Sequence, residues 1–117
     1  MNKRQLGKTD INLTAIGFGG APLGNLFENL DERNCYDILE KSYEKGINIY
    51  DTSSLYGYGL SEHRLGNFLK TVDEDSYFLS TKVGRYLTPA KKDNIDRGRF
   101  AGSLNFSPNL DYSYDGV

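Results

Sequence analysis

Apolar and polar positions are spaced as in β-strands over four short stretches of the chain. Residues 4–13 alternate around a glycine-containing turn, which is typical of a small hairpin, and we expect this hairpin to act as a lid or plug. Residues 14–20 form a short apolar run punctuated by glycine, which indicates a buried strand whose backbone allows close approach. Two further β-rich runs lie at 47–51 and 76–82. The pattern therefore predicts one hairpin followed by three core strands.

Helical spacing separates the core strands. A first helix is predicted from Asp31, a suitable N-cap, to a stop at Gly46, and a second helix is predicted to begin at a Ser61 cap. The side chains expected to face the core at this spacing are Cys35, Ile38, Leu39 and Ser42 in the first helix and Leu65, Phe68 and Leu69 in the second. Strand, helix and strand in succession indicate parallel pairing, so the predicted fold class is α/β.

The periodicity ends after Val83, and residues 84–117 are predicted to be a long loop rich in Gly, Pro, Asn and Asp. Within residues 82–99, basic side chains outnumber acidic ones. The basic side chains are Lys82, Arg85, Lys91, Lys92, Arg97 and Arg99, and the acidic ones are Asp93 and Asp96. A solvated loop explains this surplus, and a loop that faces an anionic or phosphorylated ligand is the alternative.

Composition narrows the classes of function. The 117 residues carry 14 Lys and Arg against 16 Asp and Glu, so no positive surplus drives binding to nucleic acid or to an anionic membrane. Cys35 is the only cysteine, which excludes an internal disulfide and a cysteine-rich metal site; we expect no metal and a reducing compartment, the cytoplasm. No long apolar run is present, so we expect neither membrane spanning nor secretion.

Three side chains of complementary chemistry follow the predicted strands. Asp51 ends the second core strand, Tyr56 lies five residues later, and Lys82 ends the third. Because the carboxyl ends of parallel strands share one face, these groups are expected to converge. The carboxylate would keep the lysine charged, and that charge would stabilise a tyrosinate, which gives a proton donor for a carbonyl oxygen. On spacing alone, a purely structural ion pair beside one of nine tyrosines is favoured over a catalytic role.

The glycine-rich and strand-end motifs of the chain resemble one enzyme family. The motifs are GFGGAPL at 17–23, GINIYDTSSLYG at 46–57, SEHRLG at 61–66 and STKVG at 80–84. In order and spacing they look like the first three strands of the aldo-keto reductases. Within that family, the Gly-Gly-Ala-Pro form and the closing DYSYDGV at 111–117 resemble the branch of bacterial aldose (L-fucose) dehydrogenases and pyridoxal 4-dehydrogenase.

The resemblance implies a (β/α)8 TIM barrel and NAD(P)H-dependent carbonyl reduction or alcohol oxidation. Tyr56 would be the general acid/base, Lys82 would stabilise its ionised form, and Asp51 would hold Lys82. Gly20 and Ala21, with Asp51, would border the nicotinamide end of the cofactor. NADP is the expected cofactor, with NAD possible, and a small carbonyl compound or sugar is the expected substrate.

A complete barrel of this kind needs about 250 residues and eight strands, whereas the pattern predicts three. We expect an open N-terminal part of a barrel, divided into a hairpin (1–14), three strand–helix units (15–83) and a long loop leading to a third helix (84–117). Most of the cofactor site and the family's histidine at the end of the fourth strand would lie outside it, and His63 on the second helix is no substitute. The isolated chain is expected to be inactive; the alternative is a non-catalytic module that associates through its open sheet edge, with itself or with a complementing C-terminal portion.

Overall fold

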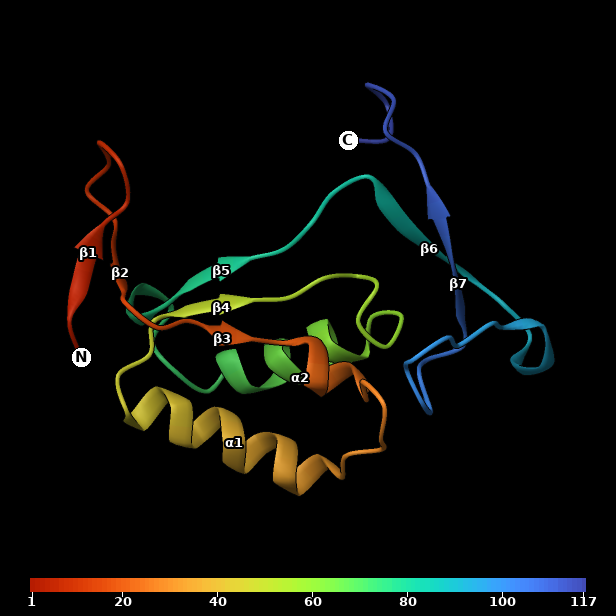
Figure 1. The fold of residues 1–117 in the computed structure, drawn as a ribbon, viewed down its shortest axis with the longest axis horizontal. Coiled ribbons are helices and arrows are strands. Elements are labelled where there is room, and N and C mark those ends of the chain that lie inside the picture. Colours follow the sequence, from red (N-terminus) through yellow and green to blue (C-terminus); the bar gives the residue numbers. More distant parts are fainter.

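A parallel sheet of three short strands lies at the centre of the computed structural model, which describes residues 1–117. Its strands are β3 (Phe18–Gly19), β4 (Ile49–Asp51) and β5 (Phe78–Ser80), in the order β3-β4-β5. Both pairings are parallel, with Gly19 opposite Asp51 and Asp51 opposite Ser80 (Figure 1). The predicted α/β class and the open, parallel arrangement are confirmed.

Two helices, α1 (Glu32–Glu44) and α2 (Leu60–Leu69), cover one face of this sheet (Figure 1). The predicted ends of α1 are confirmed: Asp31 Oδ1 accepts a hydrogen bond from the Asn34 amide at 3.0 Å, and Gly46 follows the helix with a φ of 81°. Ile38, expected in the core, is instead 46% exposed. The packed face of α1 is narrow because α2 and the sheet lie only on the side of Cys35 and Leu39.

The predicted cap of the second helix is wrong by two residues. Gly59 is the N-cap of α2, with a φ of 95°, and Ser61 lies inside the helix with no exposed surface. Its hydroxyl donates to the Gly20 carbonyl at 2.7 Å and lies 2.9 Å from Thr52 Oγ1. Ser61 therefore ties the helix to the ends of β3 and β4 and is not available to cap backbone amides.

The hydrophobic core fills the space between the helices and the sheet. It consists of Leu23, Cys35, Leu39, Tyr50, Leu65, Phe68 and Leu69. Phe18, Tyr50 and Leu79 stand in register across the three strands and share the face toward the helices. Tyr50, on the central strand, has no exposed surface, whereas Leu79, on the edge strand β5, is 53% exposed.

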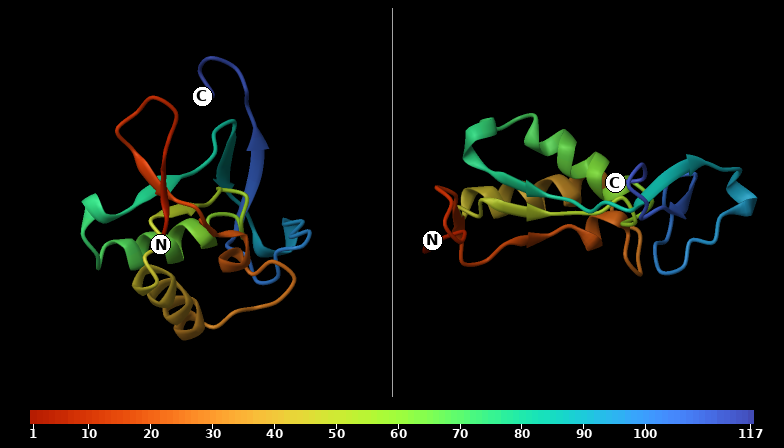
Figure 2. Two further views of the ribbon diagram at one scale, coloured as in Figure 1. Left: turned by 60° about the vertical axis from the view of Figure 1, so that its left-hand side comes forward. Right: turned by 90° about the horizontal axis from the view of Figure 1, so that it is seen from above.

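Two antiparallel strand pairs lie at opposite ends of the sheet (Figures 1 and 2). At the amino ends of the strands, β1 (Lys3–Gln5) and β2 (Asn12–Thr14) form the predicted hairpin, which Asn48 anchors by accepting from the Thr14 amide at 2.7 Å. At the carboxyl ends, β6 (Arg85–Pro89) pairs with β7 (Phe106–Leu110). The hairpin is thus distant from the carboxyl ends of β4 and β5.

The β6–β7 ribbon differs from the loop that the spacing of apolar residues predicts after Val83. Each strand contains a proline, Pro89 or Pro108, which interrupts the strand pattern, and the paired residues are far apart in the sequence. Short 3-10 helices complete the fold at Ala21–Gly24 (η1), Glu74–Ser76 (η2) and Lys92–Asn94 (η3). Neither α1 nor α2 is long and apolar enough to cross a membrane.

Candidate active site

Asp51 and Lys82 form an ion pair at the carboxyl ends of β4 and β5. The Lys82 ammonium donates to Asp51 Oδ2 at 2.8 Å and Oδ1 at 3.1 Å, and also to the Thr52 carbonyl at 2.9 Å. Ser80, on the neighbouring strand, donates its hydroxyl proton to Asp51 Oδ1 at 3.0 Å. Since β4 and β5 are parallel neighbours, their ends coincide, which brings these three side chains together.

Each member of the pair stabilises the charge of the other. The hydrogen bond from Lys82, assisted by that from Ser80, holds the pKa of the Asp51 carboxyl below its ordinary value despite some burial. The same bond raises the pKa of the Lys82 ammonium, so this lysine is charged over the whole physiological range. Both side chains are nearly half exposed, at 43% and 48%, and so lie at a surface that a ligand can reach.

Tyr56 lies beside this ion pair. The Lys82 Nζ atom is 5.3 Å from the centroid of the Tyr56 ring, so the three predicted catalytic residues are together. Tyr56 is half-buried and sits in the turn before α2, where its amide donates to the Ser53 carbonyl at 3.0 Å and its carbonyl accepts from the Ser61 amide at 3.1 Å. The backbone around Tyr56 is therefore fixed on both sides.

A contact between two glycines sets the position of the Tyr56 turn. Gly57 has a φ of 66°, and a Cβ placed on it would lie 2.5 Å from the Gly24 carbonyl oxygen. A Cβ on Gly24 would in turn overlap the backbone of Tyr56 and Gly57. Only glycine at both positions allows this approach. The roles of these two residues were not predicted from the sequence, although a glycine directly after a candidate catalytic tyrosine is a usable signal.

The predicted cofactor-binding residues Gly20 and Ala21 lie directly after β3. The Gly20 amide donates to the Asp51 carbonyl at 2.7 Å, and a Cβ on Gly20 would lie 2.8 Å from that oxygen. The Gly20 carbonyl accepts the hydrogen bond from the Ser61 hydroxyl, so both the amide and the carbonyl of Gly20 are hydrogen-bonded within the protein. Gly20 itself is buried, Ala21 is half-buried, and Gly19 before them is exposed, with open space where a side chain would stand.

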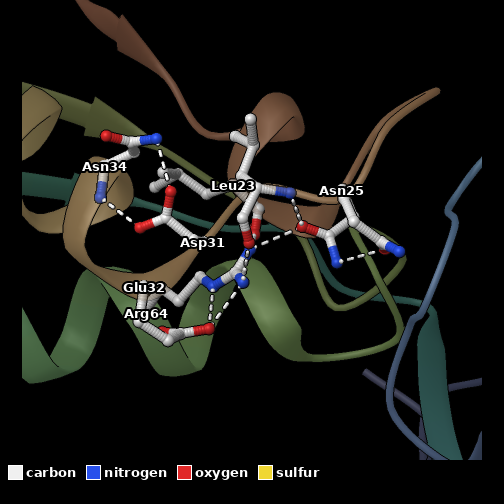
Figure 3. Close-up of polar contacts among 8 residues, drawn as sticks. Leu23, Asn25, Asp31, Glu32, Asn34 and Arg64 are labelled. Carbon is white, nitrogen blue, oxygen red and sulfur yellow. Dashed lines mark hydrogen bonds and ion pairs between the residues drawn. The ribbon is translucent and has the colours of Figure 1, made fainter.

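Arg64, which was not predicted from the sequence, supports the site from the side of the helices. Its side chain is only 6% exposed and pairs with Glu32 at 2.5 Å (Figure 3). It also donates to the carbonyls of Leu23 at 2.8 Å and Leu30 at 2.9 Å and to Asn25 Oδ1 at 2.7 Å. These bonds fix the segment that contains Gly24. The spacing of α2 could have indicated that Arg64 is buried. Arg64 lies three residues after Ser61 and four before Phe68, and these positions share the buried face of the helix.

The other polar residues considered in the sequence do not join the site. His63 is exposed on α2. In the basic segment, Arg97 is bound within the protein, to Ser103 Oγ at 2.6 Å and Asn105 Oδ1 at 2.8 Å, and Arg99 lies over the Phe27 ring. These contacts favour a structured connection over an anion-binding loop.

The sequence and structure were compared with those of known proteins. The model of the Aldo/keto reductase family matches residues 15–107. Pyridoxal 4-dehydrogenase of Microbacterium luteolum is 42% identical over 98% of this chain and 36% of its own length. D-threo-aldose 1-dehydrogenase of a Pseudomonas species is 47% identical over 66% of this chain and 23% of its own. An aldo-keto reductase from Bacillus halodurans, solved in its holo form, superimposes with a TM-score of 0.64 at 34% identity, over 82% of this chain and 29% of that one. The chain thus spans about a third or less of the length of these relatives.

Proposed function

Since this chain belongs to the aldo/keto reductase family, we propose that it forms the N-terminal part of a nicotinamide-dependent oxidoreductase that acts on a carbonyl or alcohol carbon. The observation that carries the proposal is the ion pair between Lys82 Nζ and Asp51 Oδ2 at 2.8 Å, with the Tyr56 ring 5.3 Å from the same nitrogen. We call the full-length protein that contains residues 1–117 the complete enzyme.

The three residues have distinct roles in this proposal. The Tyr56 hydroxyl donates its proton to the carbonyl oxygen in reduction and accepts it back from the alcohol in oxidation. Lys82 stabilises the tyrosinate left by that transfer, because its ammonium is close to the ring. Asp51 holds the lysine in place through two hydrogen bonds. The backbone contact between Gly24 and Gly57 fixes the turn from which Tyr56 projects.

The residues present fit the nicotinamide end of the cofactor. When bound, that cofactor supplies or accepts the hydride. Gly20, Ala21 and Asp51 would border its ring, since the space above Gly19 is open and the Asp51 carboxylate is 43% exposed beside it. NADP(H) is the proposed cofactor and NAD(H) the alternative. Its phosphates would bind mainly to parts of the complete enzyme outside residues 1–117.

The substrate class follows from the relatives. Pyridoxal 4-dehydrogenase and D-threo-aldose 1-dehydrogenase are named for a ring aldehyde and for sugars, so a small carbonyl compound or an aldose is the proposed substrate of the complete enzyme. Residues 1–117 alone would not turn it over, because three parallel strands do not enclose a barrel interior.

Steady-state kinetics of the complete enzyme test the proposal. Pyridoxal or an aldose is oxidised with NADP+ or NAD+, and Tyr56→Phe is compared with the wild type. Tyr114→Phe is the matched control, because Tyr114 is 98% exposed. A loss of kcat on the order of a hundredfold or more in Tyr56→Phe alone supports the assigned role. Wild-type turnover by Tyr56→Phe contradicts it.

The open sheet supports a second candidate function, association of the chain with itself or with a complementing part. The accessible surface is 7787 Å², whereas a folded monomer of 13.2 kDa is expected to expose about 6,400 Å². Part of the surplus is apolar, since Leu79 on the edge strand β5 is 53% exposed, and the edges of β3 and β5 have no partner strand. Light scattering of the 117-residue chain tests this: a defined oligomer supports it, and a monodisperse monomer rejects self-association.

A further inference from the structure

Phe100 reaches the candidate active site from a part of the chain far away in sequence. Its ring centroid lies 6.1 Å from that of Tyr56 and 6.4 Å from that of Tyr58. At these distances tilted aromatic rings attract each other. Lys82 and Phe100 thus both lie close to the Tyr56 ring, one with a charged and one with an apolar side chain.

Backbone hydrogen bonds hold the segment that carries Phe100 against the site. The Phe27 amide donates to the Arg99 carbonyl at 2.7 Å and the Ala101 amide to the Asn25 carbonyl at 3.1 Å, one on each side of the Leu26–Phe100 bridge. Further along, the Leu104 amide donates to the carbonyl of Gly57 at 3.0 Å, directly after Tyr56.

Side chains inside the same segment restrict it further. Arg97 bonds to Ser103 and Asn105, and Ser103 is only 6% exposed. The Tyr58 hydroxyl donates to the Asp96 carbonyl. These contacts join the β6–β7 connection to the turn of Tyr56, so Phe100 has a defined position relative to that ring.

We infer that Phe100 is a positioning residue for Tyr56: the connection between β6 and β7 places an aromatic ring that limits the orientations of the phenol beside Lys82. The catalytic consequence of this inference rests on the proposed function, whereas the contact between Phe100 and Tyr56 does not depend on it. A proton donor held in one orientation spends more time in reach of the substrate oxygen, so loss of Phe100 lowers kcat more than it weakens substrate binding.

The first test is spectroscopic and needs no activity. The 117-residue chain is labelled with 13C in its tyrosine rings, and Tyr56 is identified as the signal missing from Tyr56→Phe. In Phe100→Leu, which keeps an apolar side chain but removes the aromatic ring current, the Tyr56 and Tyr58 signals shift; in Phe100→Tyr they stay near their wild-type positions. Phe27→Leu is the control, because Phe27 is 71% exposed and lies against Arg99. Unmoved Tyr56 signals in a folded Phe100→Leu chain overturn the inference.

The second test uses the complete enzyme. Phe100→Leu is expected to lower kcat several-fold, on the order of three- to tenfold, with a smaller change in the KM for the substrate and with rescue by Phe100→Tyr. An unchanged kcat, or an equal loss in Phe27→Leu, contradicts a positioning role. If Tyr56→Phe proves fully active, the proposed function fails, while the spectroscopic result still decides whether Phe100 orders Tyr56.

Discussion

Lys82 and Asp51 are 31 positions apart in the sequence, yet their side chains meet with Nζ 2.8 Å from Oδ2. The relationship follows from the pairing of β4 with β5, because parallel neighbours end at the same edge of the sheet. It places next to Tyr56 a lysine whose pKa is raised by Asp51, and the proposed proton transfer depends on that charge.

This ion pair predicts a specific dependence of stability on pH. The pKa of Asp51 is below its ordinary value of 3.8 in the folded chain, so the pair stabilises the fold above that value and loses its contribution as pH falls through the folded pKa. The unfolding free energy of Asp51→Asn is therefore expected to decrease less than that of the wild type as pH falls below about 4. The effect at neutral pH should be under about 1 kcal/mol, because both side chains are nearly half exposed.

Urea denaturation between acid and neutral pH measures this dependence. Asp10→Asn is the control, since Asp10 is exposed and takes part in no ion pair. An acid slope that is the same in Asp51→Asn and the wild type would show that the carboxylate gains nothing from Lys82.

Arg64 is expected to be the polar residue on which the fold depends most. Arg64→Met removes the donors to the Leu23 and Leu30 carbonyls and to Asn25, and should cost about 2–4 kcal/mol of unfolding free energy. Glu32→Gln removes only the charge of a side chain that is 74% exposed, and should cost about 1 kcal/mol or less. Chemical denaturation of both variants makes the comparison, and equal losses would mean that the ion pair, and not the carbonyl contacts, matters.

The Gly24–Gly57 contact predicts an unusual sensitivity at Gly57. Gly57→Ala combines a positive φ with an overlap against the Gly24 carbonyl and should destabilise the chain by more than about 2 kcal/mol. Gly7→Ala is the matched control, because Gly7 has a similar φ of 56° but open space around its Cβ, and should cost only about 1–2 kcal/mol. Thermal unfolding of the two variants separates backbone strain from overlap. A Gly57→Ala cost no greater than that of Gly7→Ala would show that the turn of Tyr56 is not fixed by this contact.

The strand-end residues could be predicted from the sequence because their meeting follows from topology alone. A strand–helix–strand pattern implies parallel pairing, and parallel pairing places Asp51 and Lys82 at one edge. The ends of α1 could also be predicted from the sequence. An N-cap such as Asp31 and a glycine with positive φ such as Gly46 end a helix through local backbone geometry.

The supporting contacts could not be predicted because they join distant backbone atoms. In the sequence, Arg64 is one basic residue of an amphipathic helix. Two of its acceptors are backbone carbonyls, and their positions cannot be inferred from residue types. Phe100 contacts Tyr56 because β6 pairs with β7, which places the segment between these strands beside the site. Each of the two strands contains a proline, so this pairing was not predicted. Ser61 has the residue type of a cap, but its hydroxyl is bound to the end of β3.

The central claim is that the charge on Lys82 enables Tyr56 to exchange a proton with the substrate. The most direct measurement is the pH dependence of kcat for the complete enzyme and its Lys82→Met variant. We predict a loss of kcat on the order of 10²- to 10⁴-fold in Lys82→Met, with cofactor affinity little changed, and a remaining activity that rises only at more alkaline pH in the oxidation direction. Wild-type kcat and an unchanged pH profile in Lys82→Met would contradict the account.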